Sequence, residues 1–184
     1  MRAKDFFANL LYLVLAVALA LLVQTFLIRP FIVSGNSMDP IIENKEYLII
    51  NEISYRFREP QRGEVVVFRA PPEPDKYYIK RVIGLPGETV LLRGTTVTIK
   101  NAAHPDGFTL DEPYLTHDHQ SNSLTVTVPE GSYFVMGDNR DASYDSRGWG
   151  PLPKTNIKGF ALLRLFPFSK ITLLPGKETY AETN

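Results

Sequence analysis

Hydrophobic residues dominate one long run near the start of the chain. Residues 6–28 contain no charged side chain and only a few polar ones. As a helix that rises about 1.5 Å per residue, such a run can cross a hydrocarbon core roughly 30 Å thick. Arg2 and Lys4 precede the run and Arg29 follows it. Because lysine and arginine favour the cytoplasmic side of a membrane, this pattern predicts a cytoplasmic N-terminus with the rest of the chain outside.

A cleaved signal peptide is the alternative interpretation of this run. Such a peptide has an apolar core of about 7–15 residues and ends at a small-x-small triplet. The triplets 16–18 and 18–20 both satisfy this requirement, but a further apolar stretch follows them. We therefore predict that residues 1–29 form a short cytoplasmic tip and an uncleaved transmembrane anchor.

After the anchor, short β-branched and aromatic runs alternate with turn signals, a pattern typical of an all-β domain. The predicted strands are 46–53, 64–70, 77–85, 89–100, 124–128, 132–136, 159–166 and 171–174. Gly94 lies where a hairpin turn can divide the run 89–100. The predicted fold class is therefore mainly β, with an N-terminal transmembrane helix followed by a β-rich domain over residues 30–176.

Two regions lack a strand pattern. Residues 101–123 are irregular and are expected to form a long connection or a flap. Residues 177–184 form a polar C-terminal tail that we expect to be frayed. We find no internal repeat and no low-complexity tract.

Composition narrows the possible functions. At 184 residues, the chain can bury one good-sized core or two small sheets that share one. Its 20 basic and 20 acidic residues cancel and are interspersed, so no basic patch for nucleic acid is predicted. The absence of cysteine excludes thiol catalysis, disulfides and thiolate metal sites.

A turn-rich segment, SGNSMDP at residues 34–40, follows closely after the apolar run. A serine in a tight turn can present its Oγ beside an exposed backbone N–H, which together supply a nucleophile and half of an oxyanion hole. Ser37 is therefore a candidate nucleophile. The alternative is an ordinary surface turn.

A serine nucleophile needs a base, and histidine is the usual one. All three histidines lie in or beside the irregular connection, at His104, His117 and His119. The His-x-His pair, with Asp111 and Asp118 nearby, also suggests a metal site, but no third ligand has diagnostic spacing. Solvated loop histidines are the simpler interpretation.

Lysine is the other possible base. Lys80 and Arg81 are adjacent within the apolar strand 77–85. Successive side chains of a strand point to opposite faces, so if one face is packed, one of these cations must point inward. Arginine keeps its proton, whereas burial can depress the pKa of a lysine by several units. Lys80 is thus a candidate general base, and the alternative is a lysine that reaches solvent at a sheet edge.

A charge-dense segment, GDNRDASYDSRGWG at residues 137–150, directly follows the strand 132–136. Such a turn is usually only solvated. Its carboxylates and arginines can instead form a hydrogen-bonded network that fixes a neighbouring site.

These segments, in this order behind an N-terminal anchor, resemble the bacterial type I signal peptidases, which are serine–lysine proteases. The matching segments are 34–40 (SGNSMDP), 55–68 (YRFREPQRGEVVVF), 78–88 (YIKRVIGLPGE) and 137–147 (GDNRDASYDSR), with 112–115 (EPYL) as a weaker element. One such motif is weak, but four in the same order are highly specific. The resemblance covers the chain from the anchor to about residue 150.

The resemblance implies a role for each matching residue. Ser37 corresponds to the nucleophile, Lys80 to the general base and Ser143 to a serine that hydrogen-bonds the lysine. Asp145 and Arg147 correspond to a structural ion pair. The remaining implied residues are Asp138 as a supporting carboxylate, and Phe31, Val33, Met38 and Ile79 in the substrate pockets.

This sequence departs from the family pattern at three positions. At the position of Gly35, some members carry a serine that donates its hydroxyl to the oxyanion. Ser34 is one residue out of register with that serine and does not take its role. The second oxyanion donor is then a backbone group or water. Ile41 stands where threonine is common, and Glu88 replaces a usual aspartate. The short connection after Lys80 implies an accessory region reduced to about residues 89–128.

The resemblance implies a fold of the signal-peptidase and repressor-protease type and a Ser/Lys endopeptidase that removes signal peptides without metal or cofactor. It implies single-pass insertion in the plasma (inner) membrane with the catalytic domain on the extracytoplasmic face. The expected partners are preprotein signal peptides and the lipid bilayer, with no nucleic acid, and a monomer is expected. The alternatives are a self-cleaving repressor-type protease, and an anchored β-domain that binds extracytoplasmic partners without catalysis.

Overall fold

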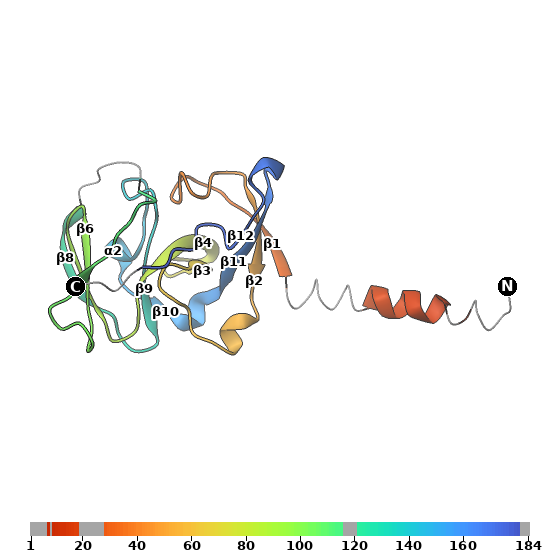
Figure 1. Ribbon diagram of the computed structural model, residues 1–184, viewed down its shortest axis with the longest axis horizontal. Coiled ribbons are helices and arrows are strands. Elements are labelled where there is room, and N and C mark those ends of the chain that lie inside the picture. The colour runs from red at the N-terminus through yellow and green to blue at the C-terminus, as the bar shows by residue number, and fades with distance from the viewer. Residues whose placement is uncertain (1–6, 8, 19–27, 116–120, 181–184) are drawn as a thin grey trace.

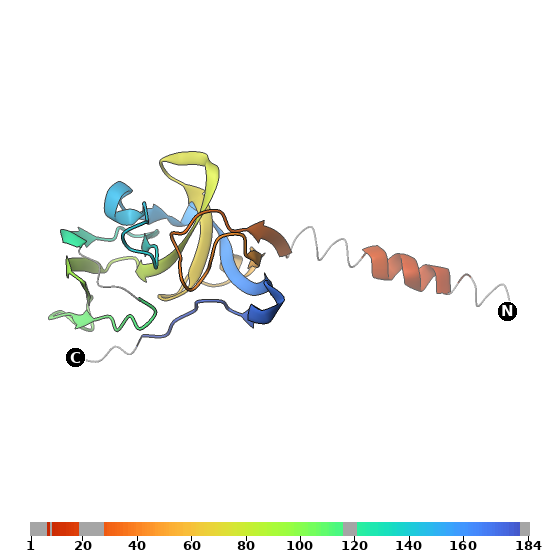
Figure 2. The same cartoon turned by 90° about the horizontal axis from the view of Figure 1, so that it is seen from above.

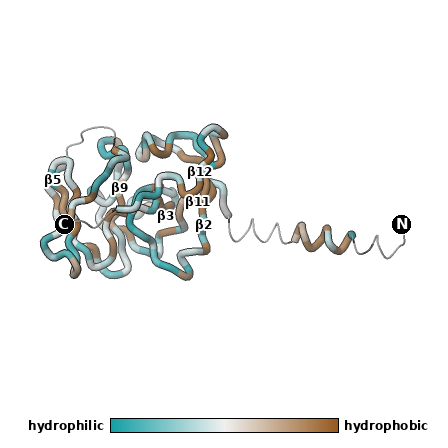
Figure 3. The backbone as a smooth tube through the Cα atoms, in the orientation of Figure 1, coloured by the Kyte–Doolittle hydropathy of each residue, from teal (hydrophilic) through white to brown (hydrophobic). Residues whose placement is uncertain are grey.

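The computed structural model describes residues 7, 9–18, 28–115 and 121–180. Within the predicted anchor, residues 7 and 9–18 are helical, and Figure 3 shows this segment as mostly hydrophobic. No helix in the described part of the chain is both long and apolar enough to cross a membrane. Residues 19–27 lie outside the described part, so the full anchor stays a prediction.

An eight-stranded antiparallel sheet forms the larger part of the β domain (Figure 1). Its path runs through β1 (Ile28–Ile32), β2 (Tyr47–Asn51), β11 (Ile157–Phe166), β3 (Val65–Ala70), β4 (Glu73–Gly84), β9 (Ser132–Met136) and β10 (Leu152–Pro153), and β12 (Thr172–Leu173) pairs with β11. The long β3–β4 hairpin stands out from the body of the domain in Figure 2.

A smaller antiparallel sheet packs beside it. The strand order is β7 (Phe108–Thr109), β6 (Thr96–Lys100), β5 (Thr89–Gly94) and β8 (Ser121–Thr127). Gly94, at φ +59°, adopts the left-handed conformation in the turn between β5 and β6, which confirms the predicted hairpin. The helical turns are η1 (Ser54–Arg56), α2 (Ser146–Trp149), η2 (Lys154–Asn156) and η3 (Phe168–Lys170).

The mainly β prediction is confirmed, and all eight predicted runs contain strand. The structure adds β1, β7 and β10, of which β7 and β10 have two residues each. Such short strands carry no periodicity to detect. β1 was missed because its residues border the apolar run and were interpreted with the anchor.

Apolar side chains fill both sides of the large sheet. One core cluster contains Met38, Leu48 and Val67, and a second contains Val66, Phe68 and Val82. Val66 and Val67 are neighbours on β3 but belong to different clusters, so both faces of this strand are packed. A third cluster lies at the small sheet and includes Leu92.

Because both faces are covered at this part of the sheet, the adjacent cations Lys80 and Arg81 of β4 are both buried. Lys80 is 4% exposed and Arg81 is 0% exposed. The sequence predicted that one of these two cations points inward if one face of the strand is packed. Both faces are packed here, and both cations are buried. The two residues point to opposite faces, as strand geometry requires, but each face meets packed protein.

The C-terminal segment is docked rather than frayed, which corrects the prediction for residues 177–180. Figure 2 shows this segment running from β12 towards the small sheet. The Glu178 N–H donates to the Gly63 carbonyl at 3.2 Å. The hydroxyl of Tyr180 lies 2.8 Å from that of Tyr114. Residues 181–184 lie outside the described part of the chain.

Candidate active site

The turn that follows β1 presents Ser37. Gly35 has φ +105° and its N–H donates to Asn44 Oδ1 at 3.2 Å. Residues other than glycine rarely adopt this φ, although a Cβ on Gly35 would meet no atom within 4 Å. The backbone of this chain therefore favours glycine at this position. Ser37 itself is half-buried.

Strand β4 places Lys80 against this serine. The Lys80 Nζ lies 2.6 Å from Ser37 Oγ and 2.9 Å from the carbonyl oxygen of Ile79. The two side chains are 43 positions apart in sequence. The contact falls within the range in which a proton can pass directly between a hydroxyl and a base.

Burial lowers the pKa of Lys80 to about 8. Loss of water around the amine is the largest cause, because a charged ammonium is poorly solvated in the protein interior. The negative charges of Asp145 and Asp138 act in the opposite direction, while Arg147 assists the decrease. A substantial neutral fraction of Lys80 therefore exists near pH 8, and a neutral amine can accept the Ser37 proton.

The loop that follows β9 is organised around Asp145. This carboxylate accepts hydrogen bonds from the Gly137 N–H at 3.0 Å and from Ser143 Oγ at 2.6 Å. It also caps α2 by accepting from the Arg147 N–H, and it pairs with the Arg147 side chain at 2.8 Å. The ion pair implied by the resemblance is therefore present.

Ser143 differs from its implied role. Its hydroxyl donates to Asp145, and within the described residues no hydrogen bond joins it to Lys80. The nearby carboxylate is the stronger acceptor, since hydrogen bonds to charged groups are shorter and stronger than neutral ones. Ser143 nevertheless lies close to the site.

Gly137 permits this close approach. A Cβ on Gly137 would clash with both Ser143 and the carbonyl oxygen of Ser37. The same carbonyl accepts a hydrogen bond from the Asn139 N–H at 3.1 Å. The loop thus holds the backbone of Ser37 directly. The close approach at position 137 requires glycine, which has no side chain.

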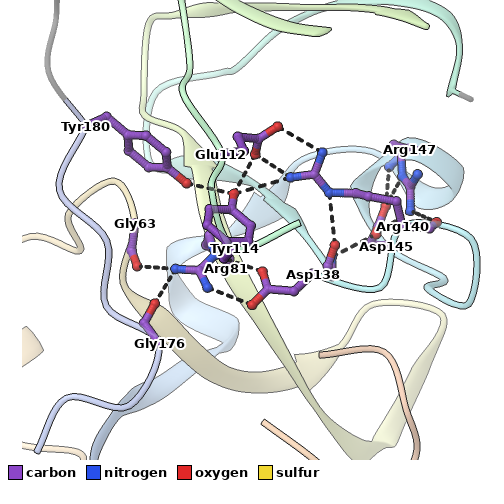
Figure 4. A network of polar contacts seen from close by, with 11 residues as sticks. Gly63, Arg81, Glu112, Tyr114, Asp138, Arg140, Asp145, Arg147, Gly176 and Tyr180 are labelled. Carbon is purple, nitrogen blue, oxygen red and sulfur yellow. Dashed lines mark hydrogen bonds and ion pairs between the residues drawn. The ribbon is translucent and has the colours of Figure 1, made fainter. Parts of the chain in front are cut away.

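Behind the site, Arg81 is the centre of a buried polar network (Figure 4). Its guanidinium donates to both oxygens of Asp138, at 2.8 and 2.6 Å, and to the carbonyls of Gly63 and Gly176. The ring of Tyr114 lies 4.0 Å from the guanidinium carbon. Burial disfavours the charge of Arg81, but the hydrogen bonds and charge of Asp138 outweigh burial and raise its pKa.

The network continues into the loop that follows β9. Glu112 pairs with the buried Arg140 side chain, whose Nε donates to the Gly137 carbonyl at 3.1 Å. Tyr114 donates to Glu112 and meets Tyr180 (Figure 4). Through Glu112 and Tyr114, the weak EPYL element therefore has a structural role. It links the irregular segment 101–115 to the C-terminal segment and to the active-site loop.

A cavity of about 510 Å³ opens between the segment 31–37 and strand β4. Of the four implied pocket residues, Phe31, Val33 and Ile79 line it. Met38 does not line the cavity and packs behind it in the core cluster of Val33, which corrects that expectation. Lining residues that the sequence analysis missed are Ile32, Leu48, Val67, Lys76, Tyr77, Tyr78, Ala142 and Tyr144.

No group of three or more metal-ligating side chains occurs among the described residues. The ring of His104 packs edge-on against Phe108, with centroids 5.1 Å apart. His117, Asp118 and His119 lie outside the described residues, so the structure does not test the His-x-His hypothesis.

Comparison with known proteins gives consistent matches over most of the chain. The sequence profile of the family "Signal peptidase, peptidase S26" matches residues 7–166. A probable signal peptidase I-1 of Synechocystis is 40% identical over 169 residues, covering 88% of this chain and 83% of that protein. The signal peptidase I of Bacillus licheniformis is 38% identical over 170 residues, covering 86% and 88%.

Among solved structures, a signal peptidase I from Enterococcus faecalis aligns with a TM-score of 0.48 at 35% identity, covering 56% of this chain and 97% of that chain. The family profile spans well over half of the chain, and the two relatives above are aligned over most of their own length. This chain belongs to the signal peptidase family, peptidase S26.

Proposed function

We propose that this protein is a membrane-bound serine endopeptidase that removes signal peptides from exported preproteins, with Ser37 as nucleophile and Lys80 as general base. The observation that carries the proposal is the 2.6 Å contact between Lys80 Nζ and Ser37 Oγ, made by a lysine that is 4% exposed. Membership of the signal peptidase family supplies the substrate class.

In the first step, neutral Lys80 accepts the Ser37 proton as Oγ attacks the scissile carbonyl. Within the described part of the chain, the Ser37 N–H donates no hydrogen bond, so it is available to the developing oxyanion. A single donor of this kind is typically worth about 3–4 kcal/mol in the transition state.

In the second step, the tetrahedral intermediate breaks its C–N bond. The protonated Lys80 gives its proton to the leaving amine, which becomes the new N-terminus of the mature protein. The signal peptide remains as an ester on Ser37. Neutral Lys80 then accepts a proton from water as the water attacks the ester, and it returns this proton to Ser37 Oγ as the ester C–O bond breaks. The signal peptide leaves as a carboxylic acid, which loses its proton to solvent, and Ser37 and neutral Lys80 are restored.

Strand addition provides the means of binding an extended substrate. Strand β4 pairs with β3 along one side, whereas among the described residues its pairing with β9 on the other side covers only Arg81–Gly84. In the described structure, the earlier part of β4 thus has an open edge beside the cavity. Phe31, Val33 and Ile79 leave room between them for small side chains of the signal peptide.

The N-terminal helix supports membrane attachment. Residues 10–18 are all apolar or aromatic and are exposed in the described structure, which is the arrangement expected of a helix whose surroundings are lipid. Ser37 follows this region closely in sequence, so a single anchor would hold the site on the extracytoplasmic surface of the plasma membrane. We propose that the enzyme acts there as a monomer.

Cleavage of a preprotein in detergent tests the catalytic pair. Ser37→Ala and Lys80→Ala are expected to reduce cleavage below detection, and Lys80→Arg is expected to be nearly inactive because arginine keeps its proton. The matched surface variants Ser169→Ala and Lys154→Arg should cleave normally. Near-normal activity of Ser37→Ala or Lys80→Ala would refute the assignment and favour a domain that binds partners without catalysis.

A further inference from the structure

A second cavity, of about 380 Å³, lies between the active-site loop and the small sheet. One side is formed by the loop residues Arg140, Ser143, Tyr144, Asp145, Arg147 and Gly148, and the other by Leu92 of β5 and by Asn122, Ser123 and Leu124 of β8. The catalytic steps above use none of the residues from the small sheet.

This cavity adjoins the catalytic cavity. Tyr144 lines both cavities, and its side chain is 56% exposed. The neighbouring Ser143 lines the second cavity, and both Ser143 and the carbonyl of Ser37 lie next to Gly137. An extended chain that leaves Ser37 past Tyr144 therefore enters the second cavity within a few residues, at about 3.3 Å per residue.

The far side of this cavity contains a sheet edge. Strand β8 is the last strand of the small sheet, and within the described structure it pairs only with β5. Its other side presents backbone groups to a further strand. Asn122 and Ser123 are exposed there. Leu92 and Leu124 are direct partners in the β5–β8 pairing and line the cavity. Leu92 is buried in the core of the small sheet, so the half-buried Leu124 supplies most of the apolar contact.

Charges around this cavity are balanced. Arg147 pairs with Asp145, and Arg140 pairs with Glu112. A cavity with compensated charges and an open strand edge suits an extended polypeptide, whose backbone supplies hydrogen bonds regardless of sequence. It does not select a strongly charged ligand.

We propose that this second cavity is the subsite for the first residues of the mature protein, on the leaving-group side of the scissile bond, and that Tyr144 positions this segment. The proposal rests on the proposed function. The direction follows from the catalytic cavity: its end at Phe31 and Ile32 lies on β1, next to the proposed anchor, and suits the signal peptide. The other end of the catalytic cavity, at Ala142 and Tyr144, then accommodates the leaving segment of the mature protein.

Disulfide trapping tests the direction, because the chain has no cysteine and an introduced thiol is unique. Ser123→Cys is made in the full-length Ser37→Ala protein, in detergent, and mixed with preproteins that carry one cysteine within about six residues before or after the cleavage site. Ile32→Cys, in the same background, reports on the signal-peptide side. Phe57→Cys, where the native side chain is 84% exposed, is the solvent control.

Ser123→Cys is expected to trap the mature-side cysteines at least about tenfold more than the signal-side cysteines, and Ile32→Cys should show the opposite preference. Phe57→Cys should trap neither. If Ser123→Cys traps signal-side cysteines, or traps none, the subsite is refuted. A different result would refute the proposed function: cleavage of the preprotein by the cysteine-free Ser37→Ala protein.

Kinetics test the role of Tyr144. Two peptide substrates share one signal-peptide sequence and end one or six residues after the scissile bond. The native enzyme should favour the longer peptide in kcat/KM by about tenfold. Tyr144→Ala should lose most of that advantage while Tyr144→Phe and the surface variant Phe57→Ala retain it. An equal preference in the native enzyme and Tyr144→Ala would overturn the positioning role.

Discussion

Replacing Lys80 by methionine should abolish cleavage and yet stabilise the protein at neutral pH. The folded protein holds the pKa of Lys80 at about 8, compared with an ordinary value of 10.5 in the unfolded chain. Between these values the unfolded state binds one proton more than the folded state, so stability increases as the pH rises. Methionine has nearly the same length and carries no charge to desolvate.

The magnitude follows from the shift in pKa. One unit corresponds to about 1.4 kcal/mol, so the full cost of protonating Lys80 in the folded protein is about 3 kcal/mol. Methionine loses the hydrogen bonds to Ser37 and to the Ile79 carbonyl, each worth about 1 kcal/mol. We therefore expect Lys80→Met to be more stable than the native protein by about 1–2 kcal/mol at pH 7.

The pH dependence gives the sharper comparison. From pH 7 to pH 9.5 the native protein should gain about 2 kcal/mol relative to Lys80→Met. Urea unfolding of the full-length chain in detergent can be followed by fluorescence of Trp149, the single tryptophan. Lys76→Met is the control, because this lysine is on the same strand with its side chain 65% exposed. A difference between the native protein and Lys80→Met that does not change with pH would refute the desolvation of Lys80.

Three other predictions follow from the same structure. The kcat/KM for preprotein cleavage should fall about tenfold per pH unit below pH 8, as Lys80 becomes protonated; a flat profile from pH 6 to pH 9 would contradict this. Gly137→Ala should lower kcat/KM by about 100-fold, because the added Cβ displaces the Ser37 backbone. In the control Gly94→Ala, the added Cβ has open space, so this variant should lose stability without an equal loss of activity. Tyr180→Ala should lower the free energy of unfolding by about 2 kcal/mol and Tyr180→Phe by about 1 kcal/mol, and unchanged urea midpoints would show that the C-terminal segment does not contribute to stability.

The sequence predicted most of the strands because each is a local pattern. Runs such as 64–70 and 132–136 are dense in β-branched and aromatic residues and end at glycine or proline. Pattern reasoning missed β7 and β10, since two residues have no period. It also left residues 177–180 as a frayed tail, because the contacts that hold them, with Gly63 and Tyr114, lie far away in sequence.

The candidate site divides in a similar way. The motifs identified Ser37, Lys80 and the loop 137–147, and the structure brings all three together. Sequence comparison alone placed Met38 in the pocket and Ser143 on the lysine, whereas packing directs Met38 into the core and the carboxylate of Asp145 takes the Ser143 hydroxyl. Neither outcome has a local sequence signal.

By itself, the sequence determined which residues can react: a serine in a turn, an amine within an apolar strand, and no thiol. It also determined the strand pattern and the apolar N-terminal run. Only the tertiary structure decided that both faces of β4 are covered at Lys80 and Arg81, so that Lys80 loses its water and its pKa falls to about 8. The physical reason is that hydration and distance depend on segments far apart in the chain, and no local pattern encodes a 2.6 Å contact across 43 positions.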